Sequence, residues 1–167
     1  TSATGSFKIT GGNSFSGNNI RIVRVNGVAV CNIVAHTGDN STTASNVATA
    51  ITNFSSTPNY TATASTNTVT ITASDVGVAT NGFVITVEVD GAVTVGSIVN
   101  MSGGINNAIT NITVNGVSII DKPIIWATSH THTASLVADA INEYITTPEY
   151  EATSVDQNVN IITKESG

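Results

Sequence analysis

The 29 residues Thr43–Ile71, TASNVATAITNFSSTPNYTATASTNTVTI, recur 90 positions later as TASLVADAINEYITTPEYEATSVDQNVNI, residues Thr133–Ile161. Of these 29 aligned positions, 14 carry the same residue. Upstream, the string VNGV stands at Val25–Val28 and again at Val114–Val117, 89 positions apart. A repeat of this kind indicates that one supersecondary unit occurs twice. The one-residue difference in spacing falls before the longer repeat, where a loop tolerates an insertion.

The repeated segment predicts a helix followed by a β-hairpin. Its apolar residues fall at helical spacing and form one stripe. They are Ala44, Val47, Ala48, Ile51 and Phe54 in the first copy and Ala134, Val137, Ala138, Ile141 and Tyr144 in the second. Pro58 and Pro148 exclude continuation of either helix. Residues 60–64 and 68–72 then alternate Thr with Ala, Val and Ile, which predicts a hairpin that turns at Thr66-Asn67.

A second hairpin is predicted upstream of each helix. Asn26-Gly27 interrupts the β-branched run of residues 20–30, and Asn115-Gly116 does the same in the second copy. Asn-Gly is a strong hairpin signal because both residues tolerate a positive φ. The stretch from residue 36 to 43 is rich in Gly, Asp, Asn, Ser and Thr, and it is expected to be a loop that ends in helix N-cap residues.

These elements predict an α+β fold. Residues 83–89 and 93–99 are expected to add a last hairpin about Asp90-Gly91. Each unit is therefore a β-β-α-β-β arrangement, an antiparallel sheet with one helix packed on a face. The counterparts of the last two strands are missing after Ile161, so the second unit is truncated.

The repeat also predicts the domain boundaries. KITGG at Lys8–Gly12 leads into the first unit as NMSGG at Asn100–Gly104 leads into the second. The sequence begins at Thr1 without an initiator Met and stops inside the second unit, so we expect it to be part of a longer polypeptide. The expected parts are residues 1–18, the closing strand of a preceding element or a linker, residues 19–104, unit one, and residues 105–167, the incomplete unit two.

The composition favours an assembly protein over a cytosolic enzyme. The 167 residues are 40% hydrophobic, with a mean hydropathy of +0.20, which is enough for a packed core. Only 10% are charged, against about 25% in typical soluble domains. The polar surface must then consist mainly of hydroxyl and amide groups, as in extracellular β-rich proteins and virion parts.

The charge balance argues against nucleic acid and membranes as partners. The chain has 5 basic and 11 acidic residues, a net charge of −6. Affinity for nucleic acid depends on neutralising phosphates, and anionic membranes also attract basic segments. No apolar run approaches the roughly 20 residues that span a bilayer, and the first residues show no signal-peptide pattern.

The histidines and the single cysteine are candidate ligands. In His130-Thr131-His132, two imidazoles would share one side of an extended segment, a pattern that can bind a metal ion. The aligned Asn40 and Thr42 offer no such pair, so a plain solvent loop before the helix is favoured and no metal is predicted. His36 is expected to be a surface residue at a strand end. Cys31 is expected to be a small buried hydrophobe on a strand.

No catalytic or cofactor-binding residue is predicted. Glu149 and Glu151 would share the exposed face of a strand and could hold Ca²⁺ weakly, but a solvated edge is favoured. Asp75, Glu88 and Asp90 show no spacing that pairs them. No Ser stands in a G-x-S-x-G motif, and no Gly pair precedes G-K-[ST]. We therefore expect a protein that is not an enzyme.

Trp126 is the only tryptophan, and no aromatic residue matches it in the first unit. Two positions are open to it, the core of the second unit and an anchor in an interface. The core is favoured, and Trp126 remains the one interface candidate.

Three motifs resemble a small domain of tailed-bacteriophage virion proteins. They are the Asn-Gly hairpin at Val25–Val28, the T-x-x-x-V-A-x-A-I helix at Thr43–Ile51 and the Y-T-A-T strand at Tyr60–Thr63. The second unit supplies them at Val114–Val117, Thr133–Ile141 and Tyr150–Thr153. The chain is similar to the inserted β-β-α-β-β modules of podovirus tail-tube (nozzle) proteins and to modules of tail-sheath proteins.

The resemblance implies a virion structural protein, a tail component such as tube or nozzle, sheath or fibre, that acts by oligomeric assembly. Its implied partners are copies of itself, other virion proteins and a host surface glycan, and it implies no catalytic residues. A cell-surface or filament-forming repeat module is the first alternative, and a carbohydrate-binding domain is the second.

Overall fold

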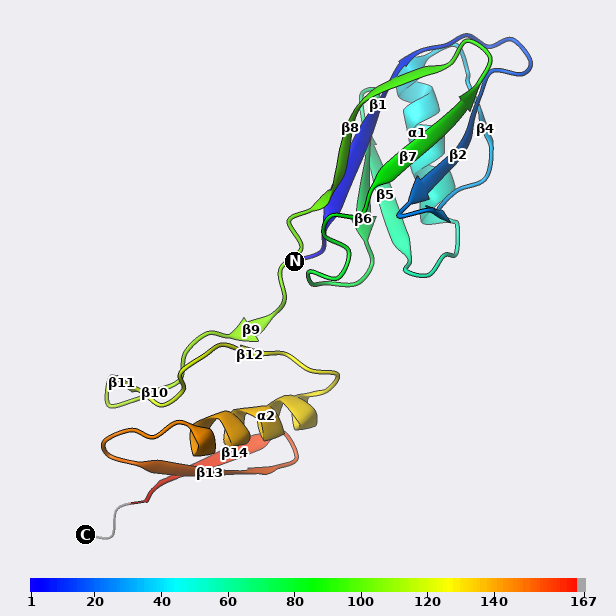
Figure 1. Ribbon diagram of the computed structural model, residues 1–167. Helices are drawn as coiled ribbons and strands as arrows, with labels where there is room; N and C mark the ends of the chain where they lie inside the picture. The colour runs from blue at the N-terminus through cyan, green and yellow to red at the C-terminus, as the bar shows by residue number, and fades with distance from the viewer. Residues whose placement is uncertain (165–167) are drawn as a thin grey trace. The chain divides into compact units, whose positions relative to one another are not determined.

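The computed structural model describes residues 1–164, which form two compact units. Unit one is Thr1–Ile105, and unit two begins at Asn106. Both units combine one helix with antiparallel strands, and each helix packs on strands (Figure 1). The predicted α+β class is therefore confirmed.

Unit one has eight strands in two sheets and one helix. One sheet has the order β5-β6-β1-β8, and in the other β2 pairs with β3, β4 and β7. The elements are β1 (Thr4–Gly11), β2 (Asn19–Val25), β3 (Val28–Ala29), β4 (Val34–Ala35), α1 (Asn40–Thr52), β5 (Tyr60–Ser65), β6 (Thr68–Ala73), β7 (Ile85–Asp90) and β8 (Thr94–Ser102).

Two of the predicted hairpins are confirmed in unit one. β2 turns into β3 at Asn26 and Gly27, whose φ angles are 50° and 81°. β5 turns into β6 through Thr66, whose φ is 50°, in the predicted register. Both central residues of the first turn have a positive φ, which is the conformation that favours Asn-Gly.

The third predicted hairpin is wrong in its pairing. The strands β7 and β8 exist, but β7 pairs with β2 and β8 pairs with β1, so the chain crosses between sheets after Asp90. Val93, in the crossing, is buried in the core. β7 thereby pairs with an edge of β2, and β8 pairs with an edge of β1. A local hairpin of β7 with β8 would leave both of these edges unpaired.

The first residues lie inside unit one. β1 is a central strand, with β6 on one side and β8 on the other. Its Phe7 and Ile9 side chains are fully buried in the same core as the helix. The predicted domain boundary separated residues 1–18 from unit one. The repeat did not indicate that β6 pairs with a strand that precedes β2 in the sequence.

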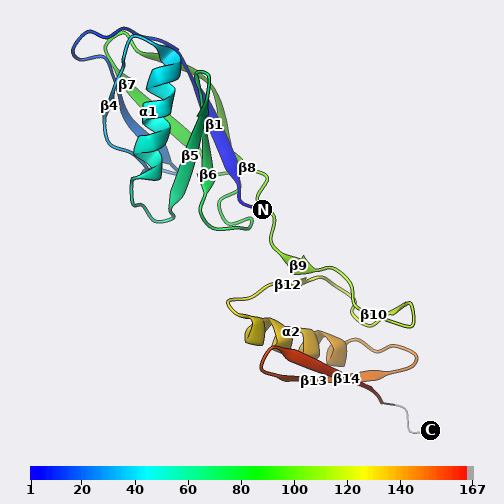
Figure 2. The same cartoon turned by 180° about the vertical axis from the view of Figure 1, so that it is seen from behind.

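Helix α1 covers the sheet that contains β5, β6 and β1 (Figure 2). Its buried side chains are Thr43 and four members of the predicted stripe, Ala44, Val47, Ala48 and Ile51. The fifth member, Phe54, lies beyond the end of the helix and is only partly buried. The helix starts earlier than predicted. Asp39 is the N-cap, and its carboxylate accepts a hydrogen bond of 2.7 Å from the backbone N–H of Thr42.

The cap should make the stability of unit one sensitive to acid. The hydrogen bonds from Thr42 lower the pKa of Asp39, so the charged form is favoured in the folded state. The resulting stabilisation is present above the unfolded pKa, about 3.9, and is lost as the pH falls through the folded value. Asp39→Ser copies the cap of unit two, Ser129. We expect the melting temperature of unit one in this variant to fall less between pH 6 and pH 3 than in the wild type.

The reciprocal variant is the control for this prediction. Ser129→Asp should give unit two an added dependence on pH in the same window, measured by circular dichroism melts. Equal pH profiles for the wild type and both variants would contradict the assignment of Asp39 as an electrostatic cap.

Unit two repeats the helix with fewer strands around it. Between residues 106 and 164 its strands form three separate pairs, β9 with β12, β10 with β11 and β13 with β14. The elements are β9 (Ala108–Ile109), β10 (Thr113–Val114), β11 (Val117–Ser118), β12 (Ile124–Ile125), α2 (His130–Glu143), β13 (Tyr150–Val155) and β14 (Asn158–Thr163). Its core joins α2 to Ile119, Ile120, Ile124, Tyr150 and Ala152.

Among the described residues, no helix is long and apolar enough to cross a membrane.

Candidate functional site

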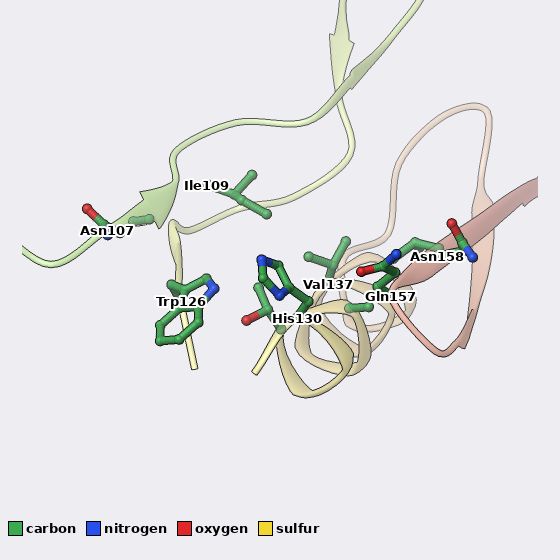
Figure 3. Close-up of a pocket in the computed structure, with 11 residues that line it drawn as sticks. Asn107, Ile109, Trp126, His130, Val137, Gln157 and Asn158 are labelled. Carbon is green, nitrogen blue, oxygen red and sulfur yellow. The ribbon is translucent and has the colours of Figure 1, made fainter. Parts of the chain in front are cut away.

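Unit two contains a groove with a volume of about 620 Å³. Its walls are β9 and Trp126 on one side and the first turns of α2 on the other, and the start of β14 closes one end (Figure 3). The lining residues are Asn107, Ala108, Ile109, Trp126, His130, Thr133, Ala134, Val137, Gln157, Asn158 and Val159. Binding sites for small ligands have volumes of about 300–1,000 Å³, so the groove is large enough for a ligand.

Trp126 lies on the wall of the groove and is not a core residue. Its side chain is 46% exposed, so the predicted core position is wrong. Its backbone N–H donates to Asn107 O at 2.8 Å, which fixes the residue after β12 against β9. The indole meets the His130 imidazole edge to face, with ring centroids 6.2 Å apart and planes at 79°. Figure 3 shows both rings at the groove.

His130 and His132 belong to the first turn of α2, so the loop predicted for them is wrong. Ser129 caps the helix by accepting from the His132 N–H at 3.1 Å. Residues two apart on a helix do not face each other, so the two imidazoles cannot share one ion as in an extended His-x-His. Within residues 1–164, no cluster of three or more His, Cys, Asp or Glu side chains could hold a metal ion.

His36 is buried, which contradicts its predicted surface position. Its Nδ1 accepts from the Gly38 N–H at 3.0 Å, so Nε2 carries the proton and donates to Asn40 Oδ1, also at 3.0 Å. Gly12 lies against the ring, where an added Cβ would come within 2.5 Å of it. The ring is thus covered by the segment that follows β1.

Cys31 is buried, as predicted, although it lies between β3 and β4 rather than on a strand. Burial raises the pKa of its thiol, which disfavours the reactive thiolate.

Three of the candidate carboxylates, Glu88, Asp90 and Glu149, lie in ion pairs at the surface. Glu88 contacts Arg21 and Arg24, and Asp90 lies 3.5 Å from Arg21. Glu149 accepts from Lys164 Nζ at 2.8 Å, at the exposed side of the β13–β14 hairpin. Partly exposed pairs of this kind contribute little to stability and assemble no acid–base pair in the groove.

The groove has a counterpart in unit one, where the same hydrogen bonds recur. His36 N–H donates to Asn18 O at 2.9 Å, as Trp126 N–H does to Asn107 O. Thr37 N–H donates to Thr43 Oγ1 at 3.1 Å, and Ala127 N–H to Thr133 Oγ1 at the same distance. Trp126 therefore occupies the place of His36. The sequence alignment, which has a gap in this region, did not reveal this equivalence.

The lining of the groove suits an uncharged ligand. Among residues 1–164, no Asp, Glu, Lys or Arg lines it, and its apolar floor of Ala134, Val137 and Val159 is flanked by the amides of Asn107, Gln157 and Asn158. Amide groups can donate to and accept from a polypeptide backbone or a sugar hydroxyl. The arrangement can bind such a ligand by burial of apolar groups and by neutral hydrogen bonds.

The comparisons with known proteins add no family to this description. No protein-family model matches the chain, and neither the curated proteins nor the solved structures yield a significant match.

Proposed function

We propose that this chain is a structural subunit of a bacteriophage virion, a tail component that acts by assembling with copies of itself and with other virion proteins. The observation that carries the proposal is the incompletely covered hairpin of unit two. Val155, Ile161 and Ile162 expose apolar side chains on β13 and β14, and Ile161 is 37% exposed where its counterpart Ile71 is fully buried. Exposed apolar surface and open strand edges favour association with other chains.

The composition and the motifs support the same proposal. Only 10% of the residues are charged, so little electrostatic repulsion opposes close packing of subunits. The Asn-Gly hairpin, the helix and the Y-T-A-T strand resemble virion modules, and both units contain all three elements.

The proposal predicts that the protein is found in phage particles. Antibodies raised against the chain should label the tails of particles purified from cells that carry its gene, as seen by immunogold electron microscopy. Particles of a deletion mutant are the control and should stay unlabelled. Labelling of host cell walls or filaments, with none on particles, would instead support the cell-surface or filament-forming alternative.

A carbohydrate-binding domain remains a second candidate because of Trp126. An exposed indole beside amide side chains resembles the lining that sugars stack on and bind to. Glycan-array binding that Trp126→Ala abolishes would favour this candidate. Equal binding by the wild type and by this variant would exclude the groove as the glycan site.

A further inference from the structure

The groove of unit two occupies the position that strand β1 fills in unit one. In unit one, β1 lies along β6, with Phe7 opposite Val69 and Lys8 opposite Thr68. Ile9 N–H donates to Asn67 O at 2.9 Å, and Asn67 Nδ2 donates back to Ile9 O at 2.8 Å. By the repeat, the counterparts of Asn67, Thr68 and Val69 are Gln157, Asn158 and Val159, and all three line the groove.

The helix side of the groove agrees with this position. Thr43, Ala44 and Val47 of α1 are fully buried. The two apolar residues among them, Ala44 and Val47, belong to the same core cluster as Phe7 and Ile9. Their counterparts in α2 are Thr133, Ala134 and Val137, which line the groove. Unit two thus retains the surface on which a β1 strand packs.

The edge of β14 is open, whereas that of β13 is protected. Among residues 1–164, β14 pairs with β13 and with no other strand. On the other edge of the hairpin, the Asn142 side chain accepts from Ala152 N–H at 2.7 Å and donates to Ala152 O at 2.8 Å. Added strands are therefore expected at β14 and not at β13.

No segment of unit one is free to fill the groove. The segment Asn100–Gly104 matches the end of β1 and the glycine that follows it, but its first three residues belong to β8, which is paired with β1 and buries Met101 in unit one. β1 itself is paired on both edges. Within residues 1–164, therefore, neither β1 nor β8 can fill the groove without dismantling the sheet of unit one.

We propose that the groove of unit two binds an extended segment of a neighbouring protein subunit, which adds to β14 as an antiparallel strand in the way β1 adds to β6. The segment has the chemistry of β1, two apolar side chains two residues apart that enter the groove, followed by Gly-Gly. Glycine is required there because a Cβ on Gly12 would collide with the His36 ring in unit one. Trp126 stands at the position of His36 in unit two, and its side chain is larger than that of His36. The identity of the donor as a subunit rests on the proposed assembly function, but the binding itself does not.

The test uses the full chain and a synthetic peptide with the sequence of residues 1–12, TSATGSFKITGG. The peptide contains no tryptophan, and Trp126 is the only one in the chain, so its fluorescence reports directly on the groove. We expect a saturable change in Trp126 emission on titration. The same peptide with Phe7→Asp or Ile9→Asp should bind at least about tenfold more weakly, since a charge would enter an apolar site.

A cross-linking experiment tests the register. Ser6 lies opposite Thr70 in unit one, and the counterpart of Thr70 is Asn160. A peptide with Ser6→Cys should form a disulfide with the Asn160→Cys chain at least about tenfold faster than with the Asn158→Cys chain, because only the first pair is within disulfide reach. The native Cys31 is buried and serves as an internal control.

Three outcomes would overturn the proposal. They are an unchanged Trp126 signal, equal binding of the Asp-substituted peptides, and Asn160→Cys chains that cross-link to each other as dimers without peptide, which would make a second β14 edge the occupant. If the peptide fails to bind but virions carry the chain, only the strand-binding proposal fails. If it binds but virions lack the chain, the proposed function fails.

Discussion

Phe7→Ala is expected to lower the free energy of unfolding of unit one by about 3–5 kcal/mol. Phe7 is fully buried at the centre of the β5-β6-β1-β8 sheet, in a core shared with α1. Removal of the ring takes away its burial and leaves a cavity that the surrounding strands can only partly fill. The loss would be a large part of the stability of a domain of this size, which is about 5–15 kcal/mol.

Phe15→Ala is the matched control, because Phe15 is 76% exposed. Its expected effect is within about 0.5 kcal/mol. Urea denaturation followed by circular dichroism measures both variants. Equal stability of the two variants would mean that β1 is not part of the core of unit one.

Ile141→Ala is expected to destabilise unit two by about 2–5 kcal/mol. Ile141 is fully buried in the last turn of α2, in the core with Tyr150 and Ala152. Unit two has only about 60 residues and correspondingly little core, so a loss of this size should leave a measurable fraction unfolded at 25 °C. Trp126 emission should report this transition, since the chain has no other tryptophan.

Ile145→Ala provides the control with the same change of side chain. Ile145 is 80% exposed, so its truncation should change the free energy of unfolding by no more than about 0.5 kcal/mol. If both variants unfold at the same urea concentration as the wild type, α2 does not depend on its predicted stripe.

The sequence predicted the local parts of the fold well. Both helices bury the first four residues of the predicted apolar stripes, whereas Phe54 and Tyr144 lie beyond the helix ends. The hairpins at Asn26-Gly27 and Thr66-Asn67 form as expected. These features depend on residues close together in the chain, namely the spacing of apolar side chains and the φ angles that a turn requires.

The long-range parts could not be predicted, because nothing local specifies them. The pairing of β1 with β6 joins residues 60 to 68 positions apart, and its period-2 pattern fits any open edge equally well. His36 was wrongly predicted to be a surface residue because the position of β1 could not be predicted. The segment that follows β1 covers the His36 ring. Trp126 was wrongly predicted to be a core residue for a related reason. The sequence could not show that no strand of residues 1–164 covers the groove that Trp126 lines.

The candidate groove had only one sequence signal. Residues 106–164 contain no repeat of β7 and β8, but the repeat did not show which surface of these residues is uncovered. Recognition of the groove required the register of β1 on β6 and the equivalence of Trp126 with His36.

The central position of β1 also sets the order of events during synthesis on the ribosome. Thr4 pairs with Ser102, so the strand that is made first waits until almost 100 further residues have been added before its second partner exists. At about 5–20 residues per second, the nascent strand stays unpaired on that edge for about 5–20 s. The helix and hairpin of unit two, by contrast, involve residues that emerge close together in time. In nascent unit one, Phe7 and Ile9 therefore stay exposed for longer than the apolar residues that form the core of unit two. Chaperones that bind apolar strands should act on β1 first.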